Sequence, residues 1–498
     1  MLLRATATTT FAMSARGYGE WVKANLLATK AIRGFLWNGS ASLIQLVTFT
    51  VIYAVSDLNT LGSFEWALSL VLLLTIVGEL GLGAALVQLR STEDLHFATA
   101  FWTNCIWGTG LSLVAYLSSS QLALWLGGED SEIFQNILKI MCLIIPFASV
   151  SSVFRARLQR NLDFAKVALS EVVSSACFAG IVAVMFWQAP KFGIMIPVIA
   201  SVFREVGLLL CLWCSSRWFP IPSWRWQCLR ELLCFALNFT GSRTIAYCNS
   251  KIAHAFVFLP LGPSAMAIYS FSERLTLIPL TRLATTLNRI SFPAFSQIQD
   301  DDALLRSGYV QAVQSLIIAM GSLLSVIFVF AHDILSLVQM SQAHTVLQIL
   351  AVATFLKVVG TMVGSMFMAK GRADWSFYWS VFSLMTLLPA MYWLGVPRGI
   401  EGVAAVIALS SFLFLLVSQQ LANRLIGLHF LDYLRQITRP ILFVCLLLSS
   451  LACVRPYLGG SEWSFMLKVF AVTIMIGLAL LRLIVWDLCQ IFFKKLKG

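Results

Sequence analysis

One apolar segment of membrane-spanning length, residues 271–299, carries four charged side chains: Glu273, Arg274, Arg282 and Arg289. At about 100° per residue along a helix, the arginines and their polar neighbours fall within about 120° of one another, on one face. A charge at the centre of a bilayer costs at least about 2.5 kcal/mol, so this face should line a bundle interior or a watery cavity. The chemistry that such a face offers is the binding of an anion.

Other cations lie in neighbouring apolar segments. Arg243 and Lys251 are eight residues apart and share a face of the helix expected just before 271–299. Lys357 lies in a later apolar segment. We therefore predict one cationic cavity lined by Arg243, Lys251, Arg274, Arg282 and Lys357. The alternative is that Lys251 and Lys357 extend to the membrane interface and only anchor their helices.

Two carboxylates inside apolar segments, Glu79 and Glu273, have two interpretations each. Either could take a coupling proton or sodium ion, because burial favours the neutral form of a carboxyl group. Equally, Glu79 could be the fixed partner of an arginine from the opposite half of the protein, and Glu273 could neutralise Arg274 or another arginine. The sequence leaves both interpretations open.

A short basic turn, FRARLQRNLDF at 154–164, contains Arg155, Arg157 and Arg160. With Arg289, at the end of its helix, these residues are predicted to form a cytoplasmic entrance that meets anionic headgroups or an incoming phosphate. The ordinary enrichment of basic residues on the cytoplasmic side explains the turn equally well.

The composition places all of these residues in a membrane protein. The 498 residues are 59% hydrophobic and 12% charged, and apolar runs of about 20 residues predict about 14 transmembrane helices. The net charge of +12 does not indicate nucleic acid, because the cations follow the topology. If the N-terminus is cytoplasmic, the outside loops hold only Lys191, Arg398 and Arg455. Both termini are therefore predicted to be cytoplasmic.

Residues 1–33 are predicted to be a polar cytoplasmic leader rather than a signal peptide, with either Met1 or Met13 as the start. Metal and disulfide chemistry are not expected. The 11 cysteines are scattered through apolar segments, and the CxxC of Cys211 and Cys214 has neither a second pair nor a nearby histidine to complete a metal site.

A weak internal repeat predicts the domain organisation. Leu61-Gly62 follows the first expected helix, and Leu261-Gly262 follows the seventh. Short basic turns come after the fourth and the tenth. The order of these features favours two six-helix lobes around a central cavity, followed by two more helices. The boundaries are 34–222 for the N-lobe, 223–425 for the C-lobe and 426–498 for the additional helices and tail.

Five strings occur along the chain in a fixed order: LGSFEWALSL, VGELGLGAALVQ, FRARLQRNLDF, LGPSAMAIYSFSERLTLIPL and ISFPAFSQIQDD. Together they resemble the polysaccharide transporter (Wzx-type) branch of the multidrug/oligosaccharidyl-lipid/polysaccharide flippase superfamily over nearly all of residues 30–425. LGSFEW departs from the family, which usually has an LGPxxFG-like turn there. The resemblance implies alternating access and the transport of an undecaprenyl-diphosphate-linked oligosaccharide across the bacterial inner membrane.

A diphosphate cargo agrees with the cationic residues, because Arg pairs with phosphate through two hydrogen bonds. The resemblance implies no cofactor, with a proton or sodium gradient as the candidate energy source. It also implies membrane lipids, and a polysaccharide polymerase and export machinery, as partners. Two alternatives compete. A multidrug or organic-cation antiporter predicts an acidic cavity, and a membrane-embedded polysaccharide-processing enzyme predicts a large loop or clustered catalytic Asp or His.

Overall fold

The computed structural model describes residues 39–89, 91–127, 131–297, 302–370 and 373–455, and in the last part of α11, beyond residue 281, only the backbone. Nearly all of this part of the chain is helical, and no strand occurs in it. The predicted all-α architecture is confirmed. The leader, residues 1–33, and the last expected helix lie outside the described residues.

The N-lobe consists of the helices before residue 217. In chain order they are Gly39–Val55, α2 (Leu58–Gly78), α3 (Leu82–Gln88), α4 (Asp94–Leu117), α5 (Ser119–Leu126), α6 (Ser131–Met141), α7 (Ile144–Arg160), α8 (Phe164–Gln188) and α9 (Met195–Ser216).

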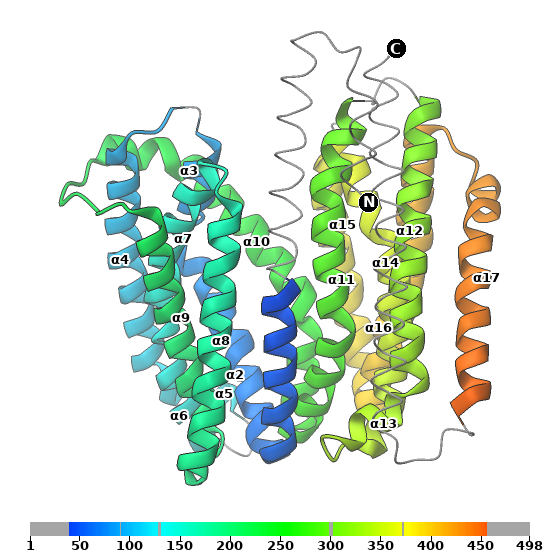
Figure 1. The fold of residues 1–498 in the computed structure, drawn as a ribbon, viewed down its shortest axis with the longest axis horizontal. Helices are drawn as coiled ribbons and strands as arrows, with labels where there is room; N and C mark the ends of the chain where they lie inside the picture. Colours follow the sequence, from blue (N-terminus) through cyan, green and yellow to red (C-terminus); the bar gives the residue numbers. More distant parts are fainter. Residues whose placement is uncertain (1–38, 90, 128–130, 298–301, 371–372, 456–498) are drawn as a thin grey trace, which may run out of the picture.

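The C-lobe and the helix beyond it follow. They are α10 (Trp226–Leu261), α11 (Pro263–Gln297), α12 (Asp302–Val329), α13 (Ala331–Ser336), α14 (His344–Ala369), α15 (Ala373–Ala390), α16 (Gly399–Ile426) and α17 (Phe430–Val454). Figure 1 shows the two lobes side by side, with α10 running obliquely between them. The loop between α9 and α10 contains the predicted lobe boundary at 222/223, which itself stays a prediction.

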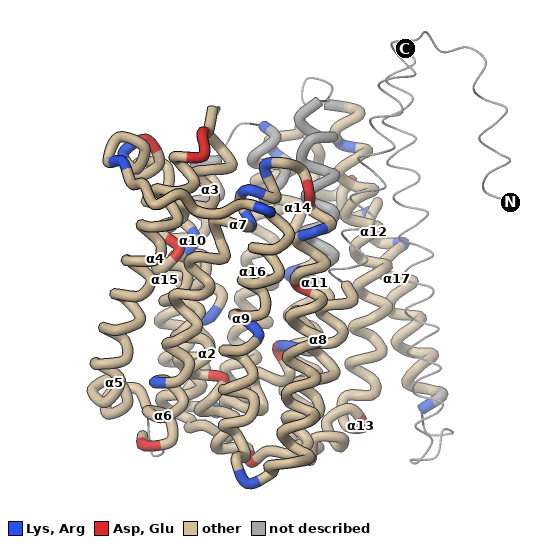
Figure 2. Tube along the Cα trace, turned by 60° about the vertical axis from the view of Figure 1, so that its left-hand side comes forward, with Lys and Arg blue, Asp and Glu red and all other residues tan. Residues whose placement is uncertain are grey.

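Within the described residues, eight helical stretches are long and apolar enough to cross a membrane. α10 and α11 are not among them, although they have 36 and 35 residues, because their sequences carry Arg243, Lys251, Glu273 and Arg274. A helix of that length spans about 50 Å, more than a bilayer is thick. In Figure 2 most charged residues lie near the two ends of the molecule, and the charges of α10 and α11 are among the exceptions.

The second apolar segment is broken, whereas the sequence predicts one continuous helix over 64–86. α2 ends at Gly78, and the chain turns through Leu80 (φ 49°) and Gly81 (φ 63°) before α3 begins. A Cβ on Gly81 would approach the carbonyl oxygen of Ala236 to 2.6 Å. The glycine therefore allows both the left-handed turn and the close packing of α3 on α10, neither of which hydropathy reveals.

The two lobes are joined where α2 begins, α10 ends and α11 begins, a region that we call the joined end. Gly62 packs directly on the backbone of Pro263. The rings of Trp66 and Phe258 stack with their centroids 5.5 Å apart. Because Gly62 has no side chain, the first turn of α2 lies against the start of α11, and this close approach positions the charged residues that follow on both helices.

Candidate functional site

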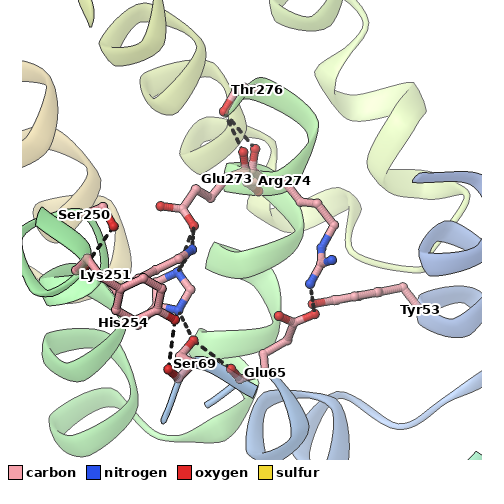
Figure 3. A network of polar contacts seen from close by, with 11 residues as sticks. Tyr53, Glu65, Ser69, Ser250, Lys251, His254, Glu273, Arg274 and Thr276 are labelled. Carbon is pink, nitrogen blue, oxygen red and sulfur yellow. Dashed lines mark hydrogen bonds and ion pairs between the residues drawn. The ribbon is translucent and has the colours of Figure 1, made fainter. Parts of the chain in front are cut away.

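Arg274 of α11 forms an ion pair with Glu65 of α2, across the boundary between the lobes (Figure 3). Its Nη2 donates to Glu65 Oε1 at 2.5 Å, and the hydroxyl of Tyr53 donates to the same oxygen at 3.0 Å. The guanidinium lies over the ring of Phe49, 3.6 Å from the centroid, where the cation–π attraction is favourable. The Arg274 side chain is only 17% exposed and that of Glu65 only 4%.

A second cluster lies one turn further along α2. Glu273 Oε2 accepts from Lys251 Nζ at 2.6 Å and lies 2.8 Å from Nε2 of His254. The other ring nitrogen of His254, Nδ1, is 2.8 Å from the hydroxyl of Ser69 on α2. Tyr247 donates to the backbone oxygen of Ser69 at 2.8 Å. One carboxylate of α11 is thus shared by two groups of α10, of which His254 also contacts the N-lobe (Figure 3).

Lys357 of α14 faces this second cluster. Its ammonium group interacts electrostatically with the charges of Glu273 and Lys251, and the residue is exposed. Among the residues that the structure describes, neither an ion pair nor a hydrogen bond is made by the Lys357 ammonium group. Within the described part of the chain, Lys357 is therefore a cation of a membrane helix that has no anion of its own.

A third ion pair connects the lobes further from the joined end. Arg243 Nη1 donates to Glu79 Oε2 at 3.1 Å, with 46% of the arginine side chain and 17% of the glutamate side chain exposed. The charge of Arg155 also acts on Glu79, and the Nε of Arg155 is buried without a hydrogen-bond partner in the described segments. This geometry matches the interpretation of Glu79 as the partner of an arginine from the opposite lobe.

The structure gives two of the predicted entrance residues local structural contacts. Arg157 pairs with Asp94 at 2.6 Å. Arg160 donates to the carbonyl oxygens of Leu86 and Leu89, at 2.8 and 2.6 Å, and so caps the end of α3. Both side chains thus use these hydrogen bonds to hold α7 against α3 and α4. Arg155 is the member of the turn whose charge acts on the Glu79 carboxylate.

Two predicted residues cannot be placed in the site. Arg282 and Arg289 belong to α11, but their side chains lie outside the described part of the chain. In the described residues, no group of three or more His, Cys, Asp or Glu side chains is arranged to hold a metal ion.

Two of the most contact-rich residues of the site, Glu65 and His254, were missed from the sequence. Glu65 lies in an apolar helix, and the argument that singles out Glu79 applies equally to it. His254 is far in sequence from the other histidines, which argues against a metal site but says nothing about a carboxylate partner. Its position three residues after Lys251, on the same face of α10, was the available signal.

Comparison with known proteins shows which family the chain belongs to. The sequence profile described as "Polysaccharide biosynthesis protein" matches residues 59–321, more than half of the chain. The chain is 26% identical to the lipopolysaccharide biosynthesis protein WzxC of Escherichia coli, over 76% of this chain and 77% of WzxC. It is 24% identical to the teichuronic acid biosynthesis protein TuaB of Bacillus subtilis, over 80% of this chain and 83% of TuaB.

Solved structures share the fold. The lipid II flippase MurJ, in an inward closed conformation, matches with a TM-score of 0.67 at 15% identity, over 95% of this chain and 100% of MurJ. An inward-facing multidrug resistance MATE family transporter of the MOP superfamily matches with a TM-score of 0.58 at 16% identity, over 78% and 98%. The fold is that of polytopic membrane transporters, and by its sequence the chain belongs to the polysaccharide biosynthesis protein family.

Proposed function

We propose that this protein is a flippase that moves an undecaprenyl-diphosphate-linked oligosaccharide across the bacterial inner membrane for the synthesis of a surface polysaccharide. The family, the names of the relatives and the fold shared with a lipid II flippase support this proposal. So does the relative named as a succinoglycan biosynthesis transport protein, ExoT of Rhizobium meliloti, which is 26% identical over 52% of this chain and 51% of ExoT.

The observation that carries the proposal is the ammonium group of Lys357 beside the second cluster, which has no partner among the described residues. A cation held within a membrane helix is costly unless it pairs with an anion, and the diphosphate of the cargo is such an anion. Lys357 would make the first contact. Lys251, Arg243 and Arg274 are paired with carboxylates in this conformation, so they would reach the cargo only after exchanging partners.

The cargo would pass by alternating access of the two lobes, with its polyprenyl tail remaining in lipid. With both termini in the cytoplasm, as the distribution of Lys and Arg indicates, the joined end faces the periplasm. A polysaccharide polymerase and export machinery would receive the product on that side.

A proton or sodium ion on Glu273 or Glu79 would drive the return of the empty carrier. Glu273 is the stronger candidate, because it is shared by Lys251 and His254 and is connected to the N-lobe through the contact of His254 with Ser69. Flipping into proteoliposomes with imposed pH and sodium gradients measures the coupling. Flipping rates that are the same with and without the two gradients would exclude this coupling.

The charges at the site argue against an organic-cation exporter. Such a transporter needs carboxylates that are open to the substrate, whereas the most exposed charged groups of the site are Arg243 and Lys357, and the carboxylates of Glu65 and Glu273 are buried. Transport of organic cations by the purified protein would contradict our proposal.

The direct test is flipping of a fluorescent lipid-linked disaccharide diphosphate in proteoliposomes. We expect Lys357→Gln to slow flipping about tenfold or more, because a charge-assisted hydrogen bond to phosphate is lost. Lys357→Arg should retain most of the rate. The matched control is Lys166→Gln, at a surface lysine whose partner, Asp163, is three residues away. Wild-type protein that flips no faster than empty liposomes would overturn the proposed function.

A further inference from the structure

The guanidinium of Arg274 has more donors than its partner uses. Glu65 accepts from Nη2, whereas Nε of Arg274 is buried and has no acceptor among the residues that the structure describes. Guanidinium presents five N–H donors in a fixed fork, and a buried donor without an acceptor costs free energy. A permanent structural pair would be expected to use both edges of that fork. This arginine is held in place but is incompletely bonded.

The same pair lies beside contacts that close the lobes on one another. Glu65 is one turn from Gly62, which packs on Pro263, and next to Trp66, which stacks on Phe258. At the rim of this region Ser264 donates to the side-chain oxygen of Asn59 at 2.5 Å. An anion that separates Glu65 from Arg274 therefore removes a charged contact from the joined end itself.

We propose that Glu65 is an internal substitute for the diphosphate of the cargo. In the empty carrier its carboxylate occupies Arg274 and thereby ties α2 to α11. The diphosphate displaces it, satisfies the free Nε as well, and in the same step loosens the joined end. This inference rests on the proposed flippase function and adds a coupling rule to it: without cargo, Glu65 returns to Arg274 and the lobes stay joined.

The second cluster offers further cations to the diphosphate while keeping its own carboxylate paired. Ser69 is four residues from Glu65 and faces the same way along α2. When Lys251 turns from Glu273 to a phosphate oxygen, the carboxylate is not left unpaired, because His254 already lies 2.8 Å from the same oxygen. Lys251 and Lys357 can then act on the cargo together with Arg274.

The energetics of buried ion pairs favour this assignment over a purely structural one. Taking two charges out of water costs several kcal/mol per ion, on the order of what their attraction returns, so a buried pair contributes little net stability. Tyr53 also donates to Glu65, which leaves the carboxylate stabilised after Arg274 has been taken. The exchange costs the protein the partner of a buried carboxylate, and the new contacts between the diphosphate and Arg274 have to offset that loss.

The inference is tested by measuring, with calorimetry, how tightly the full chain in detergent binds farnesyl diphosphate. Glu65→Gln keeps the shape of the side chain and removes the competing charge, so the apparent Kd should fall about tenfold or more. Arg274→Gln should weaken binding by a similar factor. The matched control is Glu205→Gln, because Glu205 is also a buried carboxylate paired with an arginine, but Arg204 is its neighbour on the same helix of one lobe. Its Kd should not change.

A second measurement leaves Glu65 and Arg274 unsubstituted. Asn59→Cys with Ser264→Cys, in a chain whose other cysteines are replaced, should form a disulfide readily in the empty protein. Farnesyl diphosphate should slow this cross-linking several-fold, and farnesol should not. Cross-linking at the same rate with and without farnesyl diphosphate would overturn the inference, as would a Glu65→Gln variant that binds no tighter than wild type.

These outcomes separate the two proposals. If wild-type protein neither binds farnesyl diphosphate nor flips lipid-linked sugar, the proposed function fails. If it binds and flips, and Arg274→Gln weakens binding while Glu65→Gln leaves the Kd unchanged, only the role of Glu65 as a substitute fails.

Discussion

Glu79 and Arg243 form an ion pair that connects the end of α2 in one lobe with the middle of α10 in the other. We expect Arg243→Gln to lower the free energy of unfolding by about 1–3 kcal/mol, because it leaves a mostly buried carboxylate without its partner. A double-mutant cycle with Glu79→Gln, measured by thermal melting in detergent, should be clearly non-additive. Additive effects of the two substitutions would mean that the pair contributes nothing.

How far the sequence predicts this site depends on how local each contact is. Arg274, Lys251 and Glu273 stand out as charges in apolar helices, and that signal needs only the sequence around them. The partner of Arg274 is 209 residues away, and no pattern in one sequence selects Glu65 over the other carboxylates. The identity of the cation was predictable, and its partner became visible only when the two lobes were packed together.

For the fold as well, the features with a local sequence signal could be predicted, and those that depend on distant contacts could not. Hydropathy located the transmembrane helices because each needs an apolar run, but it did not reveal the break after α2. That break depends on left-handed conformations at Leu80 and Gly81 and on the approach of Ala236. Likewise, the basic turn predicted Arg160 to be an entrance residue, whereas its hydrogen bonds go to carbonyl groups at the end of α3. Basic residues that cap a helix and basic residues that bind a ligand look alike in sequence.

Gly62→Ala should prevent the lobes from joining. The new Cβ would lie 1.7 Å from the carbonyl oxygen of Pro263, so the backbones of α2 and α11 would have to separate. We expect a strongly reduced yield of monodisperse protein in size-exclusion chromatography. The matched control is Gly110→Ala in α4, where nothing lies within 4 Å of the added Cβ, and alanine is favoured over glycine by about 1 kcal/mol within a helix. Equal yields of the two variants would contradict the close packing at Gly62.

Arg160→Ala should destabilise the protein without changing the flipping rate per folded molecule. The substitution removes the donor to two carbonyl groups at the end of α3, at a cost of about 1–3 kcal/mol. A lower melting temperature together with an unchanged rate is the expected result, and Lys166→Ala should change neither. A rate that falls while the melting temperature stays the same would support the prediction that Arg160 belongs to the cytoplasmic entrance.

His254 should tolerate a polar substitution better than an apolar one. His254→Leu removes the contacts of the ring nitrogens with Ser69 and Glu273 at a position that is only 2% exposed, so we expect it to cost about 1–3 kcal/mol of stability. His254→Gln, with an amide that both donates and accepts, should cost less. Melting curves of the two variants in the same detergent give the comparison. If the leucine variant is as stable as the glutamine variant, the ring nitrogens of His254 contribute little.

The joined end also has an electrical consequence. The side chains of Lys357 and Arg243 are exposed, whereas those of Glu65 and Arg274 are buried, near the stacked rings of Trp66 and Phe258. A transmembrane voltage falls mainly across the layer that excludes water and ions, and moving one charge through the whole of it is worth about 2.3 kcal/mol per 100 mV. In the proposed alternating-access carrier, with the joined end toward the periplasm, the membrane potential would therefore act most strongly on the residues that hold the two lobes together.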